Sequence, residues 1–451
     1  MFKKNKEFIL VFLVHFLCMI VPYQLGVFLM FITSFFSVIQ LLKNNYNAFI
    51  ALLLFGAYNA SFPNVYNIKF LGISLVYSLI FLLAVSNVIR IKNVKIKSNL
   101  LFFIIPIILL IPINIIFGFI NRYTFYVFLI DLFSFITLYY FLLFSIFKRG
   151  DTIELIIKNI KSYVLFFYPL MVIVSSIIQP AETNELYFDE FSKFHAISII
   201  PIIYYGYYSF KQKLLLSCLN ILCFALIALT SYLSSLNLVL MVVSIIVIIF
   251  KSNSLFNLKT VFYISAFSIL LTPFIYISKS AKVQHKINQI PTTITNILSG
   301  DIKQIPRSPR IRVLEFINSN SDIIPYYFLT GKGYGSYFTD KTYSFKDYGI
   351  PDIEDADAYE EDALKRMEFP KGHSFLPYAL IKIGWAGIAI ISIICVFSLF
   401  IKHKDYLWLT ISTPFYVLTT LGFGFKNFLF IGLFLGIILI LYFNPKKLIN
   451  I

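Results

Sequence analysis

Charged residues are scarce in this sequence. Asp, Glu, Lys and Arg together make up 13% of its 451 residues, about half of the roughly 25% found in ordinary soluble domains. Hydrophobic residues make up 59%, and the mean hydropathy is +0.82. Because a soluble fold needs charge on its surface, this composition excludes a cytosolic enzyme, a disordered chain and a disulfide scaffold. It predicts a polytopic membrane protein.

Cysteine is also rare, and no internal repeat is apparent. The four cysteines lie inside apolar runs without the spacing of a metal site or a disulfide framework: Cys18, Cys218, Cys223 and Cys395. The lack of repeated or inverted halves argues against a secondary transporter, since many transporters are built from such repeats.

Long apolar runs dominate what is present. A spanning helix needs about 20 apolar residues, and these runs are apolar all round rather than alternating, which favours helices over barrel strands. The sequence therefore predicts an all-α fold with 12–14 transmembrane helices. The first run follows three lysines but has no small-residue cleavage site, so we expect a retained helix. The predicted spans are 8–22, 25–42, 47–62, 70–89, 99–119, 124–147, 162–179, 196–210, 214–231, 233–250, 259–278, 375–401, 406–423 and 428–444.

The net charge of +16 is explained by topology rather than by nucleic-acid binding. With the N-terminus inside, the cytoplasmic segments hold 20 Lys and Arg residues, and the short outer segments hold 4. Positive residues accumulate on the cytoplasmic side of membrane proteins. We therefore expect an inner-membrane protein with both termini in the cytoplasm, no nucleic-acid partner, and a long periplasmic loop at 279–374.

This loop divides the chain into three parts: spans 1–278, the loop 279–374 and C-terminal spans 375–451. The loop holds 13 cations and 13 acids, and loops of this length are usually functional. An amphipathic stretch at 309–320, with Pro309 near its start, predicts a helix. The acidic, aromatic stretch 343–369 suits either a sugar groove or a solvated lid.

Three arginines gather near the start of that predicted helix: Arg307, Arg310 and Arg312. The guanidinium fork binds phosphate oxygens in pairs. The cluster therefore suits either a phosphate-bearing substrate or anchorage to acidic lipid headgroups.

Two further stretches of the loop carry candidate residues. The glycines of Gly331-Lys332-Gly333-Tyr334-Gly335 permit close backbone approach to a ligand, although a plain tight turn explains them equally well. His373 lies where the loop re-enters the membrane, and its pKa near working pH suits proton transfer. An interfacial histidine beside a helix start is the alternative.

Charges inside the predicted spans are few. Lys382 lies about nine residues into its span, and Asp131 is the only carboxylate well inside a helix. A charge at such depth is costly and is usually paired or faces a polar cavity. We expect Asp131 to be the partner of Lys382.

The order of these motifs resembles the O-antigen polymerase/ligase superfamily, of the Wzy and WaaL types. The resemblance rests on Arg312 with Phe316, on Gly331-x-Gly333-x-Gly335-x-Tyr337, on His373-Ser374-Phe375-Leu376 and on Gly384-x-x-Gly387. It covers about 80 residues, together with the layout of many spans and one long loop. Ser374 stands where the family usually has Asn, and Phe316 where it often has Trp.

The resemblance implies a GT-C-like glycosyltransferase that uses undecaprenyl-pyrophosphate-linked oligosaccharides at the periplasmic face, without metal or other cofactor. It implies catalytic roles for His373, Arg312 and Arg310, and substrate binding by Gly331, Lys332, Gly333, Gly335 and Arg307. An outer arginine common in the family is missing from 230–235, so Arg122, Lys193 or the long loop would replace it in substrate binding.

This reading favours a polymerase of lipopolysaccharide O-antigen or a related surface polysaccharide, with membrane lipids and a chain-length regulator protein as partners. A ligase that transfers the glycan to lipid A-core is the alternative. A non-enzymatic transporter or flippase is disfavoured because Asp131 and Lys382 are nearly the only charges within the spans.

Overall fold

The computed structural model describes residues 6–43, 45–56, 63–65, 68–70, 73–88, 98–121, 123–147, 150–163, 167, 291–349, 367–370, 372, 375–401, 403–419 and 425–444. These residues are mostly helical, with two short pairs of antiparallel strands. The predicted spans at 196–210, 214–231, 233–250 and 259–278, and most of 162–179, lie outside them.

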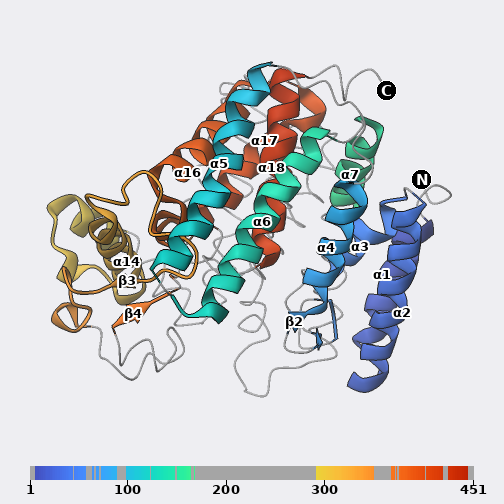
Figure 1. The fold of residues 1–451 in the computed structure, drawn as a ribbon, viewed down its shortest axis with the longest axis horizontal. Coiled ribbons are helices and arrows are strands. Elements are labelled where there is room, and N and C mark those ends of the chain that lie inside the picture. The colour runs from blue at the N-terminus through green and yellow to red at the C-terminus, as the bar shows by residue number, and fades with distance from the viewer. Residues whose placement is uncertain are drawn as a thin grey trace, which may run out of the picture.

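The N-terminal helices pack together beside the rest of the molecule (Figure 1). They are α1 (Lys6–Cys18), α2 (Tyr23–Leu42), α3 (Asn47–Gly56) and α4 (Leu75–Val88), with α7 (Gly150–Ser162) packed against α3. The short strands β1 (Lys69–Phe70) and β2 (Ile73–Ser74) pair in antiparallel fashion ahead of α4. Pro22 lies directly before α2. Because proline has no backbone N–H to donate, it cannot extend a helix that precedes it.

A second group of helices forms a bundle: α5 (Ser98–Ile120), α6 (Phe125–Phe147), α16 (Phe375–Phe400), α17 (Leu407–Thr419) and α18 (Phe425–Phe443). The parallel pair α6 and α18 packs closely, because Gly432 and Gly436 leave room for the α6 backbone. A Cβ on Gly436 would lie 2.6 Å from the Leu142 carbonyl oxygen. Small residues four apart permit this approach between membrane helices.

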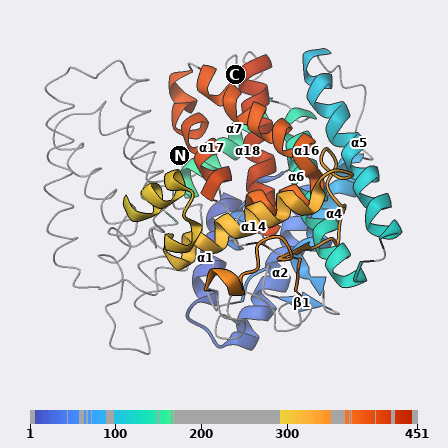
Figure 2. The ribbon, with the colours of Figure 1, turned by 90° about the vertical axis from the view of Figure 1, so that its left-hand side faces the viewer.

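The described part of the long loop lies at one end of this bundle. It contains helical residues 291–299, the short 3-10 helices η5 (Ile302–Gln304) and η6 (Lys346–Tyr348), and the strands β3 (Phe338–Thr339) and β4 (Glu368–Phe369). Its long helix, α14 (Arg307–Ile323), runs across the end of the bundle where α5 ends and α6 begins (Figures 1 and 2). The predicted helix at 309–320 is confirmed.

Nine of the predicted spans coincide with helices α1–α6 and α16–α18. Among the described residues, four helices are long and apolar enough to cross a membrane: Tyr23–Leu42, Leu100–Ile120, Phe125–Ile146 and Phe375–Phe400. The protein is therefore an all-α membrane protein. The total of 12–14 spans and the GT-C-like architecture stay predictions.

Two elements differ from the sequence-based expectation. Helix α7 was not predicted, because its apolar residues Ile153, Ile156, Ile157 and Ile160 form a single face between polar residues. The span predicted at 375–401 is interrupted at Gly384, whose φ of +60° and ψ of −171° are not helical. A short η7 (Lys404–Tyr406) then leads into α17.

Candidate functional site

The interruption of α16 is filled by the segment that follows α14. The amide of Trp385 donates to the Phe328 carbonyl at 3.0 Å, and the amide of Ala386 donates to the Leu329 carbonyl at 3.0 Å. From the other side of the break, the Ile381 carbonyl accepts from the amide of Lys332 at 2.7 Å. The loop therefore supplies backbone partners that a continuous helix would have supplied itself.

The three glycines of the motif adopt positive φ angles of 72°, 91° and 83° at Gly331, Gly333 and Gly335. A Cβ on Gly331 would lie 2.7 Å from the amide nitrogen of Gly384, and one on Gly333 would lie 2.8 Å from the Asn114 carbonyl oxygen. Only glycine combines this conformation with such close approach. The motif packs between helices α5, α6 and α16.

Most amides of this glycine loop already have protein acceptors. Besides Lys332, the amide of Tyr334 donates to the Asn114 carbonyl at 3.1 Å, and that of Gly335 donates to Asp131 at 2.7 Å. A phosphate-binding loop instead points its amides at the ligand. The positions of Gly331, Gly333 and Gly335 thus have a packing reason of their own, and their role in substrate binding stays a prediction.

A buried ion pair lies directly beneath the loop. Lys382 Nζ lies 2.7 Å from Asp131 Oδ2, and both side chains are at most 2% exposed. The hydroxyl of Tyr378 donates to the other carboxylate oxygen, and Lys382 also donates to the Ser336 carbonyl. The predicted pairing is confirmed, and each charge has the additional hydrogen bonds that burial requires.

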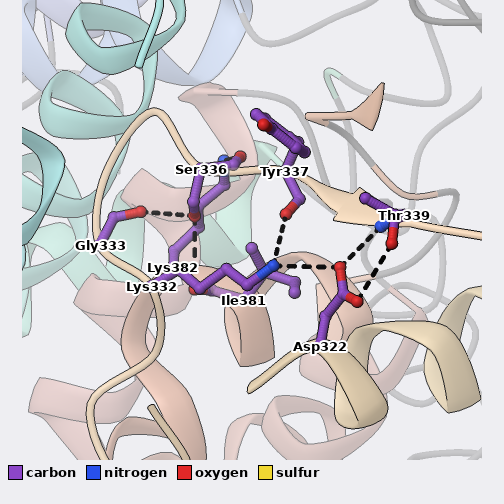
Figure 3. A network of polar contacts seen from close by, with 8 residues as sticks. All are labelled: Asp322, Lys332, Gly333, Ser336, Tyr337, Thr339, Ile381 and Lys382. Carbon is purple, nitrogen blue, oxygen red and sulfur yellow. Dashed lines mark hydrogen bonds and ion pairs between the residues drawn. The ribbon is translucent and has the colours of Figure 1, made fainter. Parts of the chain in front are cut away.

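A second ion pair lies on the α14 side of the loop (Figure 3). Lys332 Nζ lies 3.0 Å from Asp322 Oδ2 and 3.4 Å from the Tyr337 carbonyl oxygen. Asp322 also accepts from the amide of Thr339 at 2.7 Å and from its hydroxyl at 3.1 Å. Asp322 lies in the last turn of α14. Its contacts with Lys332 and Thr339 therefore tie the glycine loop and β3 to that helix.

Tyrosines surround this second pair. The rings of Tyr123 and Tyr337 lie 5.5 Å apart. Burial, together with the nearby Tyr337, Tyr327 and Asp322, raises the pKa of Tyr123 above its usual range. Tyr123 therefore stays neutral at any physiological pH.

The three predicted arginines all lie on α14, in different environments. Arg307 is exposed at the start of the helix, whereas Arg310 and Arg312 are half-buried. Arg310 donates through Nε to the Ile305 carbonyl at 2.7 Å and through Nη1 to the Tyr348 carbonyl at 2.5 Å. Its fork thus holds two loop segments, and its catalytic role stays a prediction, as do the roles of Arg307 and Arg312.

Helix α14 also brings the other motifs together. A Cβ on Gly372, the residue before His373, would lie 3.4 Å from Glu315 Oε2, one turn beyond Arg312. The indole Nε1 of Trp385 donates to Asn320 at 3.0 Å, and its ring lies 6.4 Å from that of Phe316.

Of the predicted site residues, His373, Arg122 and Lys193 lie outside the described residues.

Reasoning from the sequence missed Glu315, Asn318 and Asp322 on α14. Their spacing of three and four residues puts them on one face of the helix, and Glu315 and Asn318 are fully buried. A polar face at helical spacing was the available signal.

Across the described part of the chain, no group of three or more His, Cys, Asp or Glu could hold a metal ion.

The described helices define an all-α membrane protein with a polar site at one end of its bundle. The chain matches no protein-family model, no curated protein sequence and no solved structure.

Proposed function

We propose that this protein is a metal-independent glycosyltransferase of the inner membrane that polymerises undecaprenyl-pyrophosphate-linked repeat units into O-antigen or a related polysaccharide. The proposal rests on the sequence resemblance to the Wzy and WaaL types. In this proposal both termini lie in the cytoplasm and the site lies at the periplasmic face, as the distribution of Lys and Arg predicts.

One structural observation carries the proposal: the separate motifs of the resemblance meet at one end of the bundle. Gly331 packs on Gly384, Phe316 contacts Trp385 next to that glycine, and Gly372 approaches Glu315 beside Arg312. These stretches are up to about 70 residues apart in sequence. A functional site assembled from several motifs requires such convergence.

The proposed chemistry uses only protein groups. A hydroxyl of the acceptor sugar attacks the anomeric carbon of the donor, the bond from that carbon to the pyrophosphate oxygen breaks, and the pyrophosphate leaves on the lipid. Arg312 and Arg310 stabilise the negative charge that develops on the leaving group. His373 accepts the proton of the attacking hydroxyl.

Deletion of the gene in its bacterial host, followed by electrophoresis of lipopolysaccharide, tests this function. Loss of a polymerase leaves core with one repeat unit. Bare core with accumulated lipid-linked polymer indicates the ligase instead, and unchanged bands would refute both.

Variants then test the site. Arg312→Ala and His373→Ala are each expected to abolish long-chain polymer while membrane insertion is retained, as measured by the amount of full-length protein in the membrane fraction. Unchanged polysaccharide ladders would remove the residue from the site. A requirement of the purified enzyme for Mg²⁺ or Mn²⁺ would refute the metal-independent mechanism.

A further inference from the structure

The glycine loop contacts three membrane helices at positions inside their ends, within the helix bundle. Tyr334 binds α5 at Asn114, six residues before its last residue Ile120. Gly335 binds α6 at Asp131, six residues after its first residue Phe125. A Cβ on Gly335 would also lie 3.0 Å from the Phe128 side chain, three residues after Phe125. At a rise of 1.5 Å per residue, the loop therefore reaches about 4–9 Å inside the ends of these helices.

The third helix also holds the segment inside its end. Lys332 binds α16 at Ile381, six residues after Phe375, and Leu329 binds at Ala386, farther still along the helix. All three helices therefore place the segment inside their ends, and the conclusion does not depend on the bounds of any one of them. Although residues 324–337 belong to the long loop by sequence, they enter the membrane helices instead of lying above them.

A segment that enters a bilayer needs backbone partners within the protein, because the hydrocarbon layer offers no water to its polar groups. Non-helical backbone is tolerated within a membrane only where the protein satisfies its polar groups. The amides of Tyr327, Gly331, Lys332 and Tyr334 all donate to carbonyl oxygens, and the carbonyls of Phe328 and Leu329 accept from α16.

The outward side of the same segment is apolar and uncovered. The side chains of Tyr326 and Leu329 are 88% and 62% exposed, and Ile324 and Phe328 are exposed as well. The segment continues the exposed apolar end of α5, where Phe119 and Ile120 are more than 60% exposed, and Tyr327 stacks edge-on against Phe117 of α5 at 5.7 Å. Large exposed apolar patches mark contact surfaces, and the adjoining surface belongs to a membrane-spanning helix.

We infer that residues 324–337 form a re-entrant segment whose Tyr326 and Leu329 side chains contact the lipids of the adjacent bilayer leaflet. The partner of this surface is the bilayer itself, with both side chains at the outer ends of the acyl chains and the tyrosine hydroxyl directed toward the headgroups, where amphipathic rings are favoured. This contact is independent of the reaction proposed above.

Spin labelling tests the inference on the full chain reconstituted in lipid vesicles. The four natural cysteines are replaced by alanine, and nitroxides are attached at Tyr326→Cys or Leu329→Cys. The matched control is Thr342→Cys, an exposed position of the same loop outside the re-entrant segment. Collision with oxygen, which partitions into lipid, is compared with collision with a water-soluble nickel chelate.

We expect oxygen to dominate at positions 326 and 329, giving a positive depth parameter, and the nickel chelate to dominate at 342. Dominance of the nickel chelate at 326 and 329 would place them in water and overturn the inference. Low access to both reagents would show that another protein surface covers them, which would overturn it equally.

A second measurement avoids the cysteine replacements. Tyr326→Trp in the otherwise natural chain is expected to add fluorescence that brominated acyl chains quench, relative to the parent with its two tryptophans. Added fluorescence that iodide quenches and brominated lipid does not would contradict lipid contact.

Discussion

The carboxylate of Asp131 on α6 and the ammonium of Lys382 on α16 form a buried ion pair at 2.7 Å. The two residues are 251 positions apart. Asp131 accepts from the Gly335 amide of the glycine loop, and Lys382 donates to the carbonyl of Ser336, the next residue. The pair therefore joins two membrane helices and fixes the loop between them.

Removal of either charge alone is expected to destabilise the protein. Asp131→Asn keeps an acceptor for Gly335 but leaves the Lys382 ammonium buried without a counter-ion. Lys382→Met leaves the carboxylate in the same state. Removing one partner of a buried ion pair lowers the free energy of unfolding by about 3–5 kcal/mol. The loss is measured as a lower midpoint of thermal unfolding of the purified protein in detergent.

The double variant Asp131→Asn with Lys382→Met is expected to recover part of that loss, because no unpaired charge remains. Asp301→Asn, at an exposed position, serves as the control and is expected to unfold like the parent. A double variant whose loss equals the sum of both single losses would show that the two charges are not coupled.

Gly333→Ala is expected to lower stability by more than its backbone conformation explains. Gly333 and Gly300 both have positive φ, at 91° and 75°, so alanine at either position costs about 1–2 kcal/mol. A Cβ at 333 would also lie 2.8 Å from the Asn114 carbonyl oxygen, whereas nothing lies within 4 Å of a Cβ at 300. The difference between their thermal unfolding midpoints measures the clash, and equal midpoints would contradict the close packing of the loop on α5.

Arg310→Lys is expected to loosen the turn at 345–349. Arginine holds both the Ile305 and the Tyr348 carbonyls, and a lysine has one nitrogen that cannot reach both with the same geometry. Trypsin is expected to cleave faster at the exposed Lys341 and Lys346, as measured by mass spectrometry of the released peptides. If the proposed catalytic role also holds, polymer formation falls in part.

The matched control is Arg307→Lys, at the exposed first residue of α14, for which we expect unchanged cleavage. Equal cleavage of Arg310→Lys and the parent would show that the two backbone contacts of Arg310 do not hold the turn.

The sequence by itself determined the class of protein and the positions of its described apolar helices. Several of its apolar runs reach the length needed to span a bilayer, and that signal is local. It also suggested the pairing of Asp131 with Lys382, because a buried charge requires a partner and the spans offer few others, and the structure confirms that pair. The helix at 309–320 was predictable for a local reason too, since proline favours the first turn of a helix.

Only the tertiary structure decided where the loop lies and where α16 breaks. The break at Gly384 depends on the carbonyls of Phe328 and Leu329 and the amide of Lys332, which come from more than 50 residues away in sequence. Without those partners the same apolar run predicts a continuous helix. The glycines were equally ambiguous, because a tight turn, a ligand loop and a packing contact all favour glycine. Which of these applies depends on the helices that surround them, here α5, α6 and α16.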